Sequence, residues 1–208
     1  MGDLSGRNFG LLIAYLIPGF LVLLGLSTVS EPVDLWLRGV GTGGPSVGSA
    51  LYVLIASVAC GMTASVIRWA VLDTLHHATG IVRPRLDESR LADRLEAFDY
   101  LVECHYRYYQ FYGNTLVATL VAYAAWSGGP SGSVSAGGLA AVLALAAVFV
   151  AGSRDALRKY YAGSALLLGT LEQEITHDQR QAPPQDHHPA DQAVDGGGAD
   201  DGQGRHDS

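Results

Sequence analysis

The amino-acid sequence predicts an all-α integral membrane protein: a four-helix bundle whose third and fourth helices extend into a cytosolic helical stalk, followed by a disordered acidic C-terminal tail. Three observations lead to this prediction. The 208-residue chain contains four apolar runs. Its hydrophobic fraction is 49% and its charged fraction only 16%, which is below that of ordinary soluble proteins. After residue 178 the chain contains almost no large apolar side chains.

Each apolar run is close to the roughly 20 residues that a helix needs to cross a bilayer. The predicted membrane domain covers residues 1–178, and its four spans lie at about residues 9–29, 49–72, 109–127 and 138–153. Pro18 falls near the middle of the first span and removes a backbone hydrogen bond there. In the second span, Gly61 and Ser65 form a pair of small residues at a spacing that lets two helices approach closely.

The last two spans are predicted to continue as cytosolic helical extensions, over residues 87–108 and 154–177. Apolar residues recur at helical spacing in both extensions, so we expect the two to pack together as a stalk. The seam would consist of Leu91, Leu95, Phe98, Leu157, Tyr160 or Tyr161, Ser164, Leu168, Leu171 and Ile175. Within the fourth span, small side chains share one helical face that is smooth enough to pack in the bundle centre. These residues are Ala140, Ala144, Ala147 and Ala151.

Residues 179–208 are rich in Pro, Gly, Asp, Gln and His and cannot form a core, so a disordered tail is predicted. Most arginines lie between spans two and three or after span four, whereas the two opposite loops contain only Arg38. The positive-inside rule therefore places both termini on the cytosolic side of a cytoplasmic (inner) membrane. Lys159 is the only lysine among 13 basic residues, which is typical of a GC-rich bacterial genome. The net charge of −7 argues against nucleic acid as a partner.

The stretch from Asp99 to Asn114 carries most of the unusual chemistry. Polar residues recur there every three or four positions, on one face of a helix that enters the membrane near Tyr109. This polar face consists of Glu96, Asp99, Glu103, Arg107, Gln110 and Asn114. Glu103 precedes Arg107 by four residues, the favourable order for a helical ion pair. The amides of Gln110 and Asn114 should face other helices or a wet cavity, because exposure to lipid would leave them without hydrogen bonds.

Arg68 lies about one turn inside the cytosolic edge of the second span, where it must reach outward or pair with an acid. Three acids are candidates for that pairing: Asp73, Asp99 and Glu103. Together with the polar face, they form a candidate polar cluster at the membrane boundary. Its members are Arg68, Asp73, Asp99, Glu103, Arg107, Gln110 and Asn114.

A metal site is the second candidate. Asp73, His76 and His77 share a helical face if the second helix continues that far, and His105 lies at a similar depth. Imidazole and carboxylate are normal ligands of zinc and iron. The spacing matches no established metal motif, however, and histidines at interfaces more commonly form hydrogen bonds to neighbouring groups. We therefore predict no cofactor, and the metal ion stays an alternative.

Three functions from different classes are compatible with the sequence. The first, which we favour, is an oligomeric or partner-coupled bundle whose stalk is an interaction or signalling surface, with the lipid bilayer, a second copy or a cytosolic protein as partner. The second is a membrane-embedded metal-dependent enzyme that uses the Asp73 and histidine set. The third is a small transporter or ion-conducting oligomer that uses Arg68, Gln110, Asn114 and the Pro18 kink. Signatures of α/β-hydrolases, P-loop proteins and dinucleotide-binding folds are absent from the sequence.

Overall fold

The computed structural model describes residues 3–39, 47–130 and 132–169, and the regular secondary structure in these residues is helical apart from a single isolated bridge residue. The predicted tail, residues 179–208, lies outside them, as do residues 170–177 of the predicted fourth-helix extension. Two five-residue segments are π-helical (η1 and η3), and η2 is a 3₁₀ helix. In chain order the elements are α1 (Asp3–Ser27), α2 (Glu31–Arg38), α3 (Val47–Arg68), η1 (Trp69–Asp73), α4 (Thr74–Ala78), η2 (Glu88–Arg94), α5 (Leu95–Leu101), η3 (Val102–Tyr106), α6 (Arg107–Gly128) and α7 (Ala136–Leu168).

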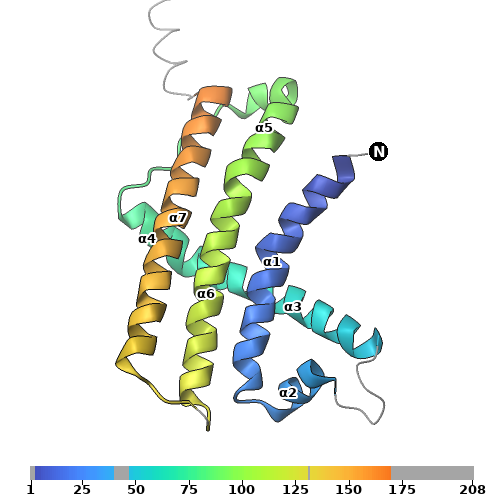
Figure 1. Ribbon diagram of the computed structural model, residues 1–208. Coiled ribbons are helices and arrows are strands. Elements are labelled where there is room, and N and C mark those ends of the chain that lie inside the picture. Colours follow the sequence, from blue (N-terminus) through green and yellow to red (C-terminus); the bar gives the residue numbers. More distant parts are fainter. Residues whose placement is uncertain (1–2, 40–46, 131, 170–208) are drawn as a thin grey trace, which may run out of the picture.

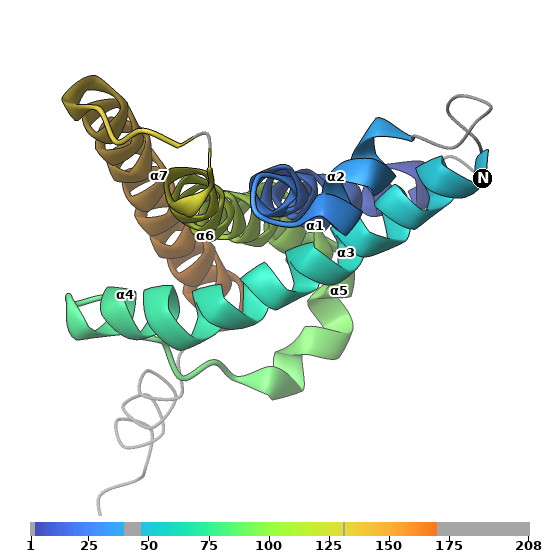
Figure 2. The same ribbon diagram turned by 90° about the horizontal axis from the view of Figure 1, so that it is seen from below.

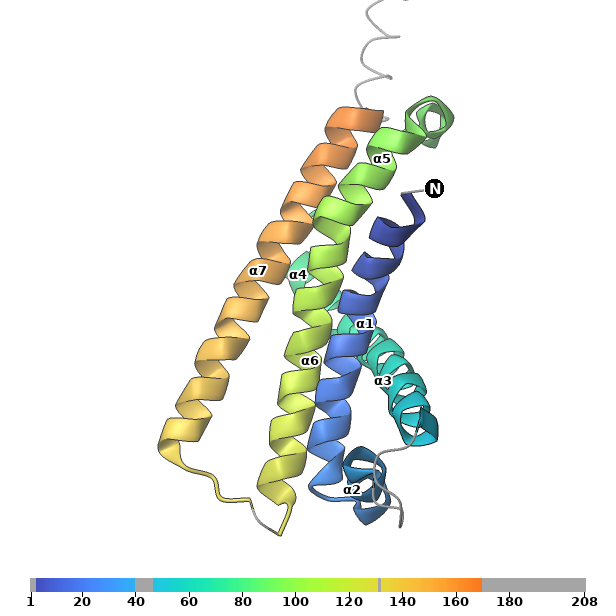
Figure 3. The same cartoon turned by 45° about the vertical axis from the view of Figure 1, so that its right-hand side comes forward.

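The helices of the described residues run in two main directions. Helices α1, α6 and α7 run roughly side by side, and the continuous rod from α3 through η1 to α4 crosses them at a steep angle (Figures 1 and 2). The start of α1 and the end of α7 lie at one end of the molecule, whereas α2 and the start of α7 lie at the other (Figures 1 and 3).

Small residues allow α1, α3 and α6 to touch backbone to backbone. A Cβ atom added at Gly19 would overlap the carbonyl oxygen of Ser57, and one added at Gly61 would overlap the carbonyl oxygen of Tyr15. At Gly25 the added atom would meet Ala122 of α6. The close approach that the small-residue spacing predicts thus occurs at Gly61, where α3 crosses α1.

The far end of α7 packs on α5. The rings of Phe98 and Tyr160 lie 6.4 Å apart between centroids, and Nη1 of Arg94 donates a hydrogen bond to the carbonyl oxygen of Leu167 at 2.5 Å. Helix α7 ends at Leu168, before the predicted limit at residue 177. The reason is local: Gly169 has a φ of 77°, a backbone conformation that favours glycine and cannot continue the helix.

The first half of α7 contains none of its buried residues, which begin at Ser153. The smooth alanine face expected in the bundle centre is instead exposed. It points away from the side on which Ser153 and Ala156 pack, because these residues lie about half a helical turn from it. The exposed residues are Ala140, Ala144, Ala147 and Ala151.

Among the described residues, two helices are long and apolar enough to cross a membrane: Val47–Ala78 and Ala136–Leu168. Little of their most apolar stretches is buried, 17% and 6% respectively, unlike the core helix of a soluble protein. The apolar part of α1, Leu12–Ser27, is shorter. Two of the four predicted spans are thus long apolar helices in the structure, which weakly supports a membrane protein.

Candidate functional site

A buried arginine organises the polar centre of the molecule. Arg68 is 3% exposed, and its Nη1 donates to Oδ1 of Asp73 at 3.0 Å. Its Nε donates to Oδ1 of Asn114 at 3.1 Å, and its guanidinium carbon lies 4.7 Å from the ring centroid of Tyr109. The hydroxyl of Tyr109 in turn donates to Oδ1 of Asp73. Of the three acids considered from sequence, Asp73 is therefore the partner of Arg68; Asp99 is half-buried on α5.

The π-helical turn η1 explains how Arg68 and Asp73 meet. The two residues are five apart, so on an α-helix their side chains would diverge by roughly 140°. A π-helix bonds residue i to residue i+5, and five residues there make little more than one turn. The inserted π-turn thus places the carboxylate of Asp73 beside the guanidinium. Single π-turns of this kind are frequent at functional sites.

The polar face of α6 lies against α1. Nδ2 of Asn114 donates to the carbonyl oxygen of Ala14 at 2.8 Å, and Nε2 of Gln110 donates to the hydroxyl of Tyr15 at 3.1 Å. Asn114 is fully buried and Gln110 is 8% exposed. Both amides therefore join α6 to α1, as their cost in lipid predicts.

The expected ion pair between Glu103 and Arg107 is not formed in the described part of the chain. Oε1 of Glu103 and Nε of Arg107 are both buried and have no hydrogen-bond partner. The side chain of Arg107 lies along α1 instead, where a Cβ atom at Gly10 would be 3.3 Å from its Cδ. Packing against a neighbouring helix has thus overridden a pairing that helical spacing favours.

The histidines expected to hold a metal have other partners. Nε2 of His76 lies 3.0 Å from Oγ of Ser153, so this fully buried imidazole joins α4 to α7. Nδ1 of His77 lies 2.6 Å from the carbonyl oxygen of Asp73 and must donate its proton there. In that tautomer Nε2 of His77 accepts a hydrogen bond from the hydroxyl of Tyr161, at 3.3 Å.

His105 is half-buried in η3. The carboxylate of Asp73, which would be the anionic ligand of a metal, is engaged by Arg68 and Tyr109. In the described ranges no group of three or more His, Cys, Asp or Glu side chains is arranged to hold a metal ion. The helical spacing of these residues therefore does not bring them together as a ligand set. The two cysteines, Cys60 and Cys104, are free thiols.

A polar cavity of about 890 Å³ lies where the two π-turns meet α7. Segments from η1, α4, the connection after α4, η3, α6 and α7 all contribute to its walls. It contains one cationic side chain, one carboxylate, one imidazole and four phenols. Its lining residues are Trp69, Ala70, Asp73, Thr74, His77, Ala78, Arg83, Pro84, Leu86, Tyr106, Tyr109, Leu157, Tyr160 and Tyr161.

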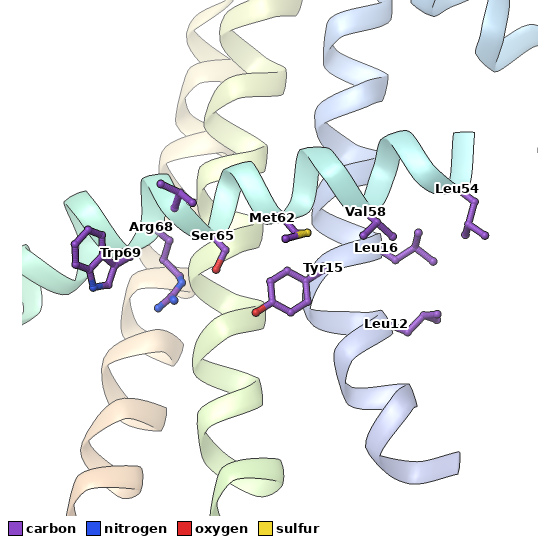
Figure 4. Close-up of a pocket in the computed structure, with 10 residues that line it drawn as sticks. Leu12, Tyr15, Leu16, Leu54, Val58, Met62, Ser65, Arg68 and Trp69 are labelled. Carbon is purple, nitrogen blue, oxygen red and sulfur yellow. The ribbon is translucent and has the colours of Figure 1, made fainter. Parts of the chain in front are cut away.

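An apolar groove of about 760 Å³ lies between α1 and α3 (Figure 4). Its polar groups, from Tyr15, Ser65 and Arg68, lie toward one end, and Leu12 and Leu54 lie toward the other (Figure 4). The remaining lining residues are Leu16, Val58, Met62, Val66 and Trp69. Trp69 lines both the groove and the polar cavity, so the pair of Arg68 and Asp73 stands in the wall between them.

Sequence reasoning missed several residues of this region. From the sequence, Tyr109 marks where the helix is expected to enter the membrane, and Arg83 is one of several arginines between the second and third spans. Tyr161 was expected only as an alternative packing residue of the stalk seam, and Tyr15 gave no signal at all, because their hydrogen-bond partners are on other helices. A helical wheel describes one helix at a time and cannot show which faces of two helices meet.

No protein family model matches the chain, and no curated protein or solved structure matches it either. The function must therefore be argued from the exposed apolar surfaces, the polar cluster and the two cavities.

Proposed function

We propose that the chain is a four-span protein of the cytoplasmic membrane that assembles with further copies of itself. The observation that carries this proposal is the outward apolar surface of two long helices. Ile55 and Val66 of α3 are 59% and 64% exposed, and Leu143 and Val148 of α7 are 58% and 62% exposed. Contiguous apolar surface of this kind marks contact with a membrane or with another protein. We assign it to both.

The ends of the helices support one orientation in the bilayer. The end of the molecule that carries the start of α1 and the end of α7 also carries α5 (Figure 1). Most arginines of the described residues lie between Arg68 and Arg107 or after Ser153, and these segments include α5 and the end of α7. We therefore place this end in the cytosol, with α2 on the opposite side.

The alanine face of α7 supports a second copy as its occupant. Within the chain, helices meet where small residues lie, as at Gly19, Gly25 and Gly61. In a bilayer apolar helices gain little from apolar contact alone, because lipid tails are equally apolar; close backbone approach provides the attraction instead. Four exposed small residues on one face of α7, which no helix of the described residues covers, fit this kind of contact.

The stalk is the part that we assign to signalling or to a cytosolic partner. It consists of η2, α5 and η3 packed on the second half of α7. Leu95 and Tyr100 are 56% and 68% exposed on its surface. By contrast, Arg68, Gln110 and Asn114 make hydrogen bonds within the chain, which favours a structural role for them over an ion pathway.

Cysteine cross-linking in native membranes tests the assembly. In a background with Cys60 and Cys104 replaced by alanine, Ala144→Cys should form an oxidative cross-link at twice the chain mass of 21.9 kDa. Leu145→Cys is the matched control, because it is also exposed on α7 but projects roughly 100° away around the helix. It should cross-link weakly.

Ala144→Phe should then shift the detergent-solubilised protein toward the monomer in light scattering. A monomeric mass at every concentration, together with equal cross-linking at positions 144 and 145, would refute the assembly.

A further inference from the structure

The polar cavity at the two π-turns has the composition of an anion site. We infer that it binds a phosphate group, held by the guanidinium of Arg83. Arg83 is exposed and lines the cavity together with Tyr160 and Tyr161. A guanidinium presents several N–H donors in a fixed plane that matches phosphate oxygens. This inference goes beyond the proposed assembly and does not require it.

The charges around the cavity favour an anion. The one carboxylate in its wall, on Asp73, already accepts hydrogen bonds from Arg68 and Tyr109. Within the described residues no carboxylate lies within 4.0 Å of a nitrogen of Arg83, so its charge is not offset by an ion pair there. The cavity wall therefore carries one positive charge that is available to a ligand.

The position of Arg83 is supported by the surrounding contacts. The connection that carries Arg83 is attached to α7, where Nη2 of Arg154 donates to the carbonyl oxygen of Thr79 at 2.6 Å. Elsewhere in the cavity lining the hydroxyl of Tyr161 donates to Nε2 of His77. A cavity of about 890 Å³ is within the range of sites for small molecules, and aromatic walls with a few convergent polar groups are typical of such sites.

Two sources could supply the phosphate: a lipid headgroup or a free phosphate compound. Trp69 is 67% exposed and lines both the cavity and the apolar groove. Tryptophan is enriched at the headgroup level of membranes, so a phospholipid could place its phosphate at Arg83 and its chains toward the groove. The experiment must therefore include both sources.

Fluorescence of Trp69 provides the measurement. The chain has three tryptophans, so Trp36→Phe and Trp126→Phe leave Trp69 as the reporter. The full-length protein in a maltoside detergent, which contains no phosphate, is titrated with inorganic phosphate in one arm and with phosphatidic acid in the other. Sodium chloride at equal ionic strength and diacylglycerol are the matched ligands without phosphate.

We expect a saturable change with at least one phosphate ligand and none with the matched controls. Arg83→Gln should weaken the apparent affinity at least tenfold, and Arg83→Lys should weaken it less. Arg38→Gln, on α2, should leave the affinity unchanged, because Arg38 pairs with Asp34 far from the cavity. Elution volume and near-ultraviolet circular dichroism show whether each variant is folded.

Saturation with phosphatidic acid alone identifies a lipid headgroup, and saturation with inorganic phosphate identifies a free phosphate site; both outcomes support the inference. No saturable change with either ligand would overturn it, and so would equal affinities in the parent and in Arg83→Gln. A protein that is monomeric at every concentration, cross-links equally at positions 144 and 145 and still binds phosphate would refute the proposed assembly and leave this inference standing.

Discussion

The pair of Arg68 and Asp73 allows a quantitative test of how the helices are held together. Asp73→Asn keeps the shape of the side chain but removes its charge, so Arg68 would remain buried without a counter-ion. Breaking a buried ion pair from one side costs about 3–5 kcal/mol. The Asp73 side chain is 23% exposed, so water replaces part of the lost interaction, and we expect about 3 kcal/mol.

Arg68→Met should cost less, about 1–2 kcal/mol, since the partly exposed Asp73 keeps water and the hydroxyl of Tyr109 as partners. With both substitutions no charge is left unpaired. The double variant should therefore be no less stable than Asp73→Asn alone, which makes the coupling free energy at least about 1–2 kcal/mol.

Thermal unfolding in detergent, followed by circular dichroism, measures all three variants. For a chain of this size, about 3 kcal/mol corresponds to a fall in Tm of roughly 6–12 °C. The reasoning is wrong if Asp73→Asn lowers Tm by less than roughly 2 °C, or if the two single effects simply add in the double variant.

Two further predictions concern packing and pH. Gly61→Ile should lower the free energy of unfolding by at least about 1–3 kcal/mol, because the new side chain must displace the backbone of Tyr15. Gly137→Ile is the control: a Cβ atom there has open space around it, so this variant should change Tm little. Hydrogen bonds from Ser89, first its hydroxyl and then its amide, together with the charge of Arg90, hold the pKa of Asp87 below its ordinary value. Because the folded pKa is depressed, this contribution to stability is fully present above the ordinary carboxyl pKa of about 3.9 and is lost as pH falls through the folded value. The difference in Tm between the parent and Asp87→Asn should accordingly be largest near neutral pH and shrink below pH 4; a difference that stays constant from pH 7 to 3 would contradict this account.

Local rules predicted the elements of this protein well. The apolar runs predicted the long helices, and Gly80, with a φ of 94°, lies just after the end of α4. The cost of burying an amide in lipid was enough to predict that Gln110 and Asn114 lie between helices. These features depend on one segment and its solvent, so they can be read from one segment of sequence.

Contacts between segments could not be read in this way. Helical spacing predicted an ion pair of Glu103 with Arg107, but Arg107 lies against Gly10 of another helix. The sequence left Asp73 as a candidate both for the histidine set and for pairing with Arg68, and the π-turn η1 placed its carboxylate beside Arg68.

By itself the sequence determined that this protein is helical, where its apolar helices lie and which of its polar groups must avoid lipid, because hydrophobic periodicity and desolvation act within a single segment. Only the tertiary structure decided that the alanine face of α7 points outward and that Arg83 shares a cavity with Tyr160 and Tyr161. The physical reason is that contacts between side chains of different helices depend on how the helices cross. The crossing depends on close contacts at glycines and on inserted π-turns, and neither produces a periodic pattern in the sequence.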